Sequence, residues 1–200
     1  MKTKEWHKRQ SRDLYVKKAT ELGYVSRSAF KLIEIDKKYN ILRKSDSILE
    51  LGSAPGGWTQ VILEIKKNKK YKLICIDKND INIPIKNFTF IKEDFNNYEK
   101  ILNKIDQKKF DLILSDISPN TTGHSNTDHL QIIQFAEDIL KFSENLLIKN
   151  GTLIIKIFQG SHEKNFIQNL KSKFKSVKYF KPESSRKSSV EIYIVCQFLF

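Results

Sequence analysis

The 200-residue chain is long enough to bury the core of one globular domain, and its 40% hydrophobic and 30% charged residues fit a soluble protein. It contains no apolar run as long as a membrane span, and its basic first residues lack the apolar segment of a secretory signal. The formal net charge of +13 favours a polyanionic partner such as RNA, although a general enrichment in lysine would produce the same charge.

The cysteines and histidines indicate neither a metal site nor a disulfide. Cys75 and Cys196 each lie in an apolar segment, where we expect small core residues in a reducing compartment. The four histidines are scattered without ligand spacing, so we assign none of them to a metal or to catalysis. We therefore expect no metal site.

The chain begins with a basic segment, residues 1–12, which we expect to be flexible, with Trp6 as its one anchor. The remaining residues, 13–200, contain no linker or repeat and are predicted to form a single domain. A helix is predicted from Asp13 to Leu22, where Gly23 would end it.

A second helix is predicted to run from Ser28, as its N-cap, to Tyr39. Lys31 lies in its first turn, where the helix dipole is unfavourable for a cation. Lys31 is therefore either a functional residue or a solvated surface lysine.

A glycine-rich turn, Gly52–Gly57, follows the predicted strand Ile48–Leu51 and leads into a helix that begins at Trp58. Glycines in such a turn let the backbone approach a ligand closely, and the helix N-terminus offers free N–H groups. The turn has neither the G-x-G-x-x-G of dinucleotide sites nor the Gly-Lys-Ser/Thr of a phosphate loop. It indicates a nucleoside cofactor without a pyrophosphate, of which S-adenosylmethionine is the obvious case. An ordinary strand-to-helix turn is the alternative.

Three further predicted strands end in, or are followed by, acidic residues. The strands are Tyr71–Asp77, Phe88–Ile91, which precedes Glu93 and Asp94, and Phe110–Asp116, and a helix over Tyr98–Ile105 separates the last two. In open α/β sheets the ligand crevice lies beyond the carboxyl ends of the strands, so Asp77, Asp94 and Asp116 should converge beside the glycine-rich turn. Asp77 has the offset from the turn at which a carboxylate binds ribose hydroxyls. A solvated strand-end aspartate is the alternative for any one of them.

Two of the remaining strands carry an unexpected charge. The elements predicted here are a helix over Asp128–Leu147 that reaches Gly151, a strand over Thr152–Phe158, a helix over Ser161–Phe174, and strands over Val177–Phe180 and Val190–Cys196. Lys156 and Glu191 lie inside otherwise apolar strands, where a charge is unfavourable unless it is paired, so we expect a partly buried pair or cluster. The loop 181–189 is basic and rich in hydroxyls, which suits phosphate contacts or plain solvation equally.

Five segments in this order, SRSAFKL, LGSAPGGW, SDISPN, IIKIFQG and KPESSRKSSVEIY, resemble the FtsJ (RrmJ) family of S-adenosylmethionine-dependent ribose 2′-O-methyltransferases. The resemblance extends from about Tyr15 to Gln197. It implies an α/β fold of the Rossmann-like methyltransferase type, a seven-stranded, mostly parallel sheet with helices on both faces and an antiparallel last strand. Residues 13–200 would then be the methyltransferase domain. Ser53 stands where alanine is common and Ile117-Ser118 where Met-Ala is common, and neither change removes a functional group.

The resemblance also implies the site residues. The family's catalytic tetrad falls on Lys31, Asp116, Lys156 and Glu191. Its cofactor contacts fall on Gly56, Trp58, Asp77, Asp94 and Asp116, to which the glycine-rich turn itself adds Gly52, Pro55 and Gly57. In this hypothesis Lys156 is the base that takes the proton of a ribose 2′-hydroxyl. Burial and Lys31 favour its neutral form, whereas Asp116 and Glu191 favour its charged form, so its protonation stays open and the four groups should titrate together.

The expected cofactor is S-adenosylmethionine and the expected partner is RNA. Asn120, the pair Asp128-His129 and the IFQG segment favour a uridine of large-subunit rRNA, within a ribosomal particle, over the anticodon loop of tRNA. The alternatives from other classes are a non-catalytic RNA-binding module and a small-molecule methyltransferase. We expect a cytoplasmic monomer that does not bind membranes, with a mitochondrion or another organelle as the alternative location.

Overall fold

The computed structural model describes residues 13–84, 87–106, 109–119, 122–160 and 163–200, of which 125–126 are described in their backbone alone. The predictions for residues 1–12, including Trp6, and for Asn120 lie outside these ranges. The strands are β1 (Ser47–Leu51), β2 (Lys72–Asp77), β3 (Thr89–Lys92), β4 (Phe110–Ser115), β5 (Leu147–Phe158), β6 (Phe174–Phe180) and β7 (Glu191–Leu199). The helices are α2 (Leu14–Glu21), α3 (Ser28–Tyr39), α4 (Gly57–Lys66), α5 (Tyr98–Lys104), α6 (Ser125–Leu146) and α7 (Glu163–Lys173), with a short 3-10 helix η1 (Phe95–Asn97).

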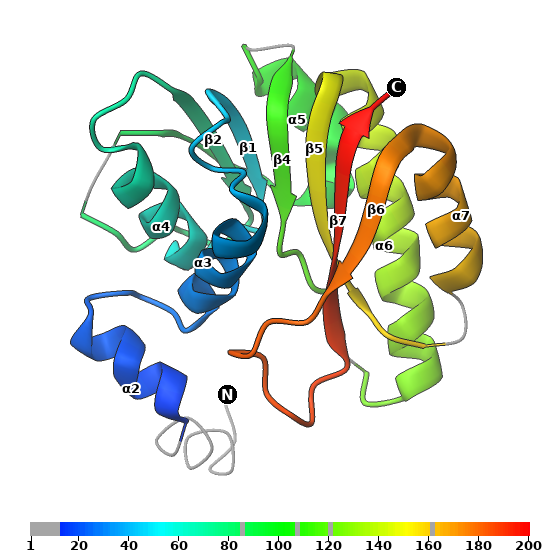
Figure 1. Ribbon diagram of the computed structural model, residues 1–200, viewed down its shortest axis with the longest axis horizontal. Coiled ribbons are helices and arrows are strands. Elements are labelled where there is room, and N and C mark those ends of the chain that lie inside the picture. The colour runs from blue at the N-terminus through cyan, green and yellow to red at the C-terminus, as the bar shows by residue number, and fades with distance from the viewer. Residues whose placement is uncertain (1–12, 85–86, 107–108, 120–121, 161–162) are drawn as a thin grey trace.

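The described strands form one seven-stranded sheet in the order β3-β2-β1-β4-β5-β7-β6 (Figure 1). The strands from β3 to β5 pair in parallel, whereas β7 is antiparallel to both of its neighbours, β5 and β6. This arrangement confirms the predicted Rossmann-like sheet with its antiparallel last strand. The first half of the chain builds one side of the sheet and the second half the other, and the order reverses between β1 and β4.

Helices cover both faces of the sheet. Helices α5, α6 and α7 pack on one face, and α3 and α4 pack on the other (Figure 1). The central strand β4 shows why its sequence is apolar throughout: Ile113 faces the α6 side, and Leu112 and Leu114 face the α3 and α4 side. Cys75 and Cys196 are fully buried, as predicted for core residues.

Two predicted boundaries are wrong for a local reason. Strand β5 begins at Leu147, five residues before the predicted start, because Leu147 still pairs with Phe110 and the strand then bulges before Thr152 resumes the ladder. The bulge holds Asn150 at a φ of 63°, and Gly151 lies within the strand. Strand β6 likewise starts at Phe174, where its pairing with β7 begins.

The predicted cap of helix α3 is also wrong. Ser28 is its first helical residue, and the Ser26 hydroxyl accepts the Ser28 N–H at 3.0 Å. Helix α2 starts at Leu14, one residue after the predicted start, because Asp13 is its N-cap and the Asp13 carboxylate accepts the N–H of Tyr15 at 3.0 Å. Gly23 follows α2 with a left-handed φ of 75°, which fits its predicted place at the helix end.

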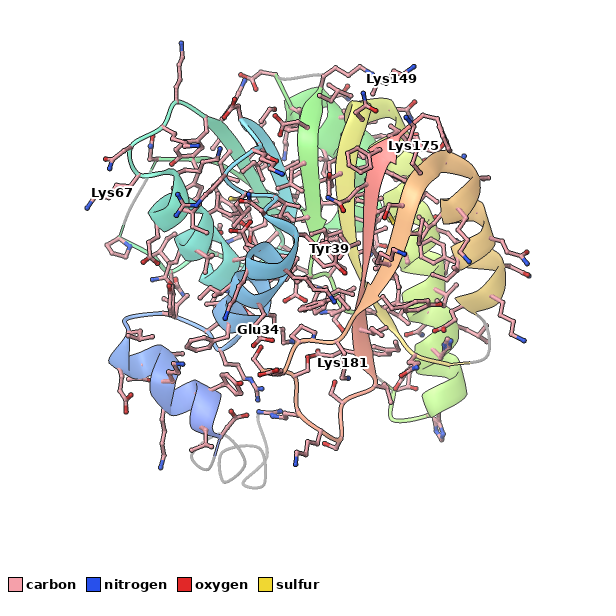
Figure 2. All side chains as sticks on the ribbon, in the orientation of Figure 1. Glu34, Tyr39, Lys67, Lys149, Lys175 and Lys181 are labelled. Atoms are coloured by element: carbon pink, nitrogen blue, oxygen red, sulfur yellow. The ribbon has the colours of Figure 1, made fainter. Side chains whose placement is uncertain are left out.

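The lysines that give the chain its charge are spread over the molecule. Figure 2 shows Lys67 beyond α4, Lys149 and Lys175 at the amino ends of β5 and β6, and Lys181 after the carboxyl end of β6. The positive charge is therefore not confined to the edge of the sheet where the predicted site lies. None of the described helices is long and apolar enough to cross a membrane.

Candidate active site

The glycine-rich turn after β1 is held closely by its neighbours. Gly52 has a φ of 76°, and a Cβ there would lie 2.8 Å from the backbone nitrogen of Ile117, which follows β4. A Cβ on Gly57 would lie 2.8 Å from the Ser28 hydroxyl, so this glycine lets α3 and α4 approach each other. The turn is thus a tight junction between β1, β4 and α3.

Asp77, at the end of β2, fixes the turn from the side. Its Oδ2 accepts the N–H of Ala54 at 2.9 Å, and its Oδ1 accepts the N–H of Asn79 at 2.8 Å. Asp94, after β3, accepts the N–H of Asn96 at 3.0 Å and thereby caps η1. Both carboxylates keep oxygen lone pairs for hydroxyl or amino groups of a ligand.

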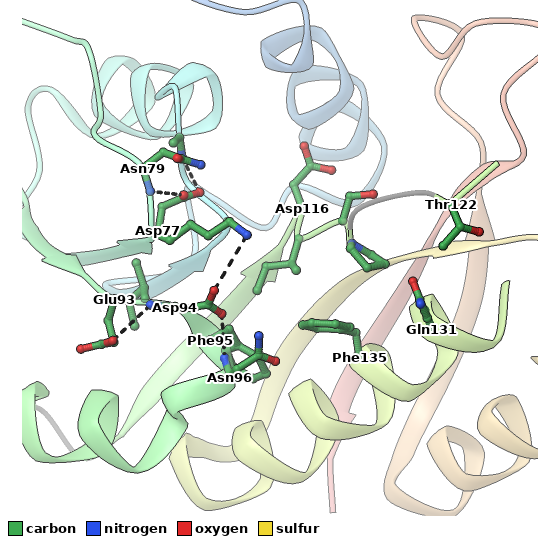
Figure 3. A pocket seen from close by; sticks show the side chains of 17 residues that line it. Asp77, Asn79, Glu93, Asp94, Phe95, Asn96, Asp116, Thr122, Gln131 and Phe135 are labelled. Carbon is green, nitrogen blue, oxygen red and sulfur yellow. Dashed lines mark hydrogen bonds and ion pairs between the residues drawn. The ribbon is translucent and has the colours of Figure 1, made fainter. Parts of the chain in front are cut away.

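A cavity of about 730 Å³ lies at the carboxyl ends of the strands. Figure 3 shows it between the acidic residues at the end of β2 and after β3 and one face of α6. Four of the predicted cofactor residues line it: Gly52, Asp77, Asp94 and Asp116. The structure therefore brings the three strand-end acids together, as the topology predicts.

The other four predicted cofactor residues are not among the residues that line this cavity. Pro55 is exposed and Gly56 abuts side chains of the segment after β2. Trp58 is 2% exposed, donates its indole N–H to the Ser28 carbonyl at 2.9 Å and packs against the ring of Tyr193. For Gly56, Gly57 and Trp58 the structure shows packing roles, and for these three and Pro55 a cofactor contact stays a prediction.

Several lining residues were not predicted from the sequence. Phe95 follows Asp94, and Gln131 and Phe135 come from α6 (Figure 3). The two α6 residues are four apart and so share one helix face, but only the docked position of α6 shows that this face meets the cavity.

The predicted tetrad is assembled on the other side of Asp116. Lys156 Nζ lies 3.0 Å from Asp116 Oδ1 and donates to the Asp116 carbonyl at 2.6 Å, while Lys31 Nζ lies 2.7 Å from Glu191 Oε1. The four side chains are between 8% and 18% exposed. The two strand charges, Lys156 and Glu191, thus belong to one cluster, but they do not pair with each other. Lys156 pairs with Asp116, and Glu191 pairs with Lys31.

Strand register explains this cluster. Lys156 of β5 pairs with Tyr193 of β7, and Phe158 pairs with Glu191, so Lys156, Tyr193 and Glu191 lie on the same face of the sheet. Lys31 reaches them from α3, and its contact with Glu191 offsets its unfavourable place near the helix N-terminus.

Tyr193 is a fifth member that the sequence analysis missed. Its hydroxyl donates to Asp116 Oδ1 at 2.7 Å, and its ring is fully buried. Burial raises the pKa of Tyr193 well above its usual value, and the Asp116 charge raises it further, so the phenol stays protonated and donates. Its position two residues after Glu191, on the same strand face, is the signal that could have found it.

The cluster keeps both carboxylates ionised. Burial alone would raise the pKa of Asp116, but Lys156, Lys31 and the Tyr193 hydroxyl outweigh it and hold that pKa below its usual value. Glu191 is similar: burial raises its pKa, and Lys31 brings it below the usual range. Asp116 is the one residue of the tetrad that also lines the cavity, so a ligand bound there lies beside the tetrad.

Comparison with known proteins shows the family to which the chain belongs. The sequence model of the FtsJ-like methyltransferases matches residues 24–199. The chain belongs to the FtsJ-like methyltransferase family. Two relatives from Wolbachia of Brugia malayi and Ehrlichia chaffeensis, each 42% identical, are named ribosomal RNA large subunit methyltransferase E; the matches cover 95% and 98% of this chain and 86% and 92% of the relatives.

Solved structures agree with this placement. A crystal structure from Plasmodium falciparum, described as a ribosomal RNA methyltransferase, is 39% identical, with a TM-score of 0.77 over 88% of this chain and 98% of the other. Human methyltransferase-like protein 13, in complex with SAH, has a TM-score of 0.54 at 15% identity over 85% of this chain and 79% of the other. The second likeness shows the shared fold alone.

Proposed function

We propose that the protein transfers a methyl group from S-adenosylmethionine to the ribose 2′-hydroxyl of a uridine in large-subunit rRNA. One observation carries the proposal: Asp116 belongs both to a cavity of about 730 Å³ and to the tetrad with Lys31, Lys156 and Glu191. The relatives' names and the net charge of +13 support an RNA acceptor.

The cavity fits the proposed cofactor in chemistry. Asp77 and Asp94 offer carboxylate oxygens to the hydroxyl and amino groups of a nucleoside, and Ile117, Phe95 and Phe135 offer apolar walls to its base. S-adenosylmethionine supplies a methyl group on a positively charged sulfur. The ionised Asp116 lies on the wall between this cavity and the tetrad and favours a positive charge nearby.

The tetrad supplies what a ribose hydroxyl needs to react. In the transfer, the 2′-oxygen forms a bond to the methyl carbon, the carbon–sulfur bond breaks with its electrons left on sulfur, and the hydroxyl proton goes to Lys156 Nζ. To accept this proton, Lys156 must first give one of its own to solvent, and the Asp116 carboxylate and carbonyl hold its nitrogen in place. Lys31 and Glu191 orient the hydroxyl, and Tyr193 keeps Asp116 in position.

Mapping of 2′-O-methyl groups tests this proposal directly. Ribosomal particles, free rRNA and tRNA from cells with and without the protein are compared, and the purified protein with S-adenosylmethionine is added back to each. We expect one large-subunit uridine to lose its methyl group without the protein and to regain it on addition. Methylation of tRNA alone would contradict the rRNA assignment, and no transfer to any RNA would contradict the function itself. The cytoplasmic location and the monomeric state stay predictions.

A further inference from the structure

The loop between β6 and β7, residues 181–190, lies at the active edge of the sheet. From the sequence alone, this loop suits phosphate contacts or plain solvation equally. Its middle is neither open nor solvated, because Ser184 is fully buried and Ser185 is 8% exposed. Buried hydroxyl-bearing residues in a loop require an explanation, since loops usually run over the surface.

Helix α3 and the residue that precedes it clamp the backbone of this loop. The Glu34 carboxylate accepts the N–H of Glu183 at 2.6 Å and the N–H of Ser184 at 3.0 Å. The Arg27 guanidinium donates to the Ser184 carbonyl, so Ser184 is held by both its N–H and its carbonyl. Figure 2 shows Glu34 on α3 beside the loop. Glu34 is one helix turn from Lys31, so the same face of α3 carries the clamp and the tetrad lysine.

Further contacts hold the rest of the loop. Arg186 Nε lies 3.0 Å from Asp13 Oδ2, an oxygen that Arg27 also contacts. At the base of the loop, the Lys181 ammonium donates to the Glu191 carbonyl at 2.5 Å. The loop is thus tied to the N-cap of α2, to α3 and to the start of β7.

The clamped loop delivers one hydroxyl to the tetrad. Ser185 Oγ donates to Glu191 Oε1 at 2.8 Å, and Lys31 Nζ contacts the same oxygen at 2.7 Å. Rotation of the Glu191 carboxylate would break both of these charge-assisted contacts. Burial raises the pKa of Glu191, and Lys31 together with the Ser185 hydroxyl lowers it, so the hydroxyl also favours the charged form that Lys31 needs.

We propose that Ser185 is a positioning residue that holds Glu191, and through it the Lys31 ammonium, in the geometry required for methyl transfer. Glu34 fixes the loop that presents the Ser185 hydroxyl. This inference rests on the proposed function, because it gives Lys31 its task in the methylation of RNA.

The test compares three serine variants. Ser185→Ala removes the hydroxyl, Ser185→Thr keeps one, and Ser188→Ala makes the same change at an exposed position of the same loop. We expect Ser185→Ala to lower kcat for RNA methylation about tenfold, as for the loss of one hydrogen bond to a charged group, while KM for RNA and Kd for S-adenosylmethionine change less than about twofold. Ser185→Thr should recover most of the loss, and Ser188→Ala should resemble the wild type.

A substitution on α3 tests whether the position of the loop matters for the Ser185 hydroxyl. Glu34→Gln replaces one of the two accepting oxygens with an amide donor that faces a backbone N–H, and it should lower kcat, whereas Glu137→Gln, at an exposed position of α6, should not. The double variant Glu34→Gln/Ser185→Ala should lose less than the product of the two single losses, because both act through one loop. Thermal melts of every variant show that the chain remains folded.

The outcomes separate the two proposals. A wild-type protein that methylates no RNA overturns the proposed function, and this inference with it. An active wild type with unchanged kcat in Ser185→Ala overturns the inference alone. An equal loss in Ser188→Ala, or no recovery in Ser185→Thr, overturns it as well.

Discussion

A buried acid next to the glycine-rich turn gives the sharpest stability prediction. Glu50 of β1 is 1% exposed, and its Oε2 accepts the Thr59 hydroxyl at 2.7 Å and the Cys75 thiol at 3.4 Å. Burial raises the pKa of Glu50 to about 8, and the two hydrogen bonds lower it only in part. Glu50→Gln should therefore stabilise the protein at neutral and higher pH, because glutamine resembles the protonated acid and carries no charge.

The sign and size follow from proton linkage. The pKa of Glu50 is raised in the folded protein, so the contribution of the protonated acid to stability is fully present below the ordinary pKa of 4.5. This contribution is lost as the pH rises from 4.5 to about 8, where the unfolded chain is already ionised and the folded protein is not. The free energy of unfolding falls by about 1.4 kcal/mol for each pH unit between 4.5 and about 8, which amounts to about 5 kcal/mol at pH 8. Glu50→Gln avoids this loss, whereas the wild type does not.

Urea unfolding of both proteins at pH 5, 6, 7 and 8 measures this difference. The free energy of unfolding of Glu50→Gln minus that of the wild type should grow steadily across the series, and effects of other titrating groups cancel in the subtraction. Glu137→Gln, at an exposed position, is the matched control and should give a constant difference. Parallel pH curves for Glu50→Gln and the wild type would refute the reasoning.

Three further predictions test the site and the core. Lys156→Ala should abolish methyl transfer while calorimetry shows S-adenosylmethionine affinity within a few fold of the wild type. Lys149→Ala, at the opposite edge of the sheet, should leave both transfer and affinity near the wild type, and turnover near the wild-type rate in Lys156→Ala would refute the assignment of Lys156. Asp77→Ala should weaken cofactor binding, and an unchanged dissociation constant in calorimetry would contradict its role. Ser53→Ala should raise the free energy of unfolding by about 1 kcal/mol, because its buried hydroxyl has no hydrogen-bond partner within the described structure, whereas Ser45→Ala should lower it, because that buried hydroxyl donates to the Ile41 carbonyl at 2.8 Å. Equal denaturation midpoints for the two serine variants would contradict this contrast.

The site residues that can be predicted from the sequence are those whose charge is unusual for their place in a strand. Lys156 and Glu191 are charges within apolar strands, and Asp77 and Asp116 are acids at strand ends, so each is visible from its neighbours in the chain. The structure brings Lys156, Glu191 and Asp116 within one cluster and Asp77 to the adjoining cavity.

The site residues that cannot be predicted from the sequence are ordinary for their positions in strands and loops. A tyrosine in a strand is an ordinary core residue, and only the antiparallel pairing of β7 with β5 places Tyr193 opposite Lys156. Ser185 is one hydroxyl among four in its loop, and the contacts of Glu34 and Arg27 with the loop backbone decide which one meets Glu191. Trp58 follows the turn directly, yet its side chain packs toward α3 because of where α4 lies on the sheet.

The antiparallel direction of β7 has a consequence for how the site forms. Tyr193 meets Asp116 across 77 residues of chain, and β6 is joined to the rest of the sheet only through β7. During synthesis, the strands up to β5 can pair while β6 has no partner, and the last described strand then enters between two strands made before it. Its entry extends the sheet and completes the tetrad in one event. A nascent chain that stops short of β7 therefore holds the acids of the cavity and both lysines of the tetrad, but it lacks Glu191, the partner of Lys31, and Tyr193, the partner of Asp116.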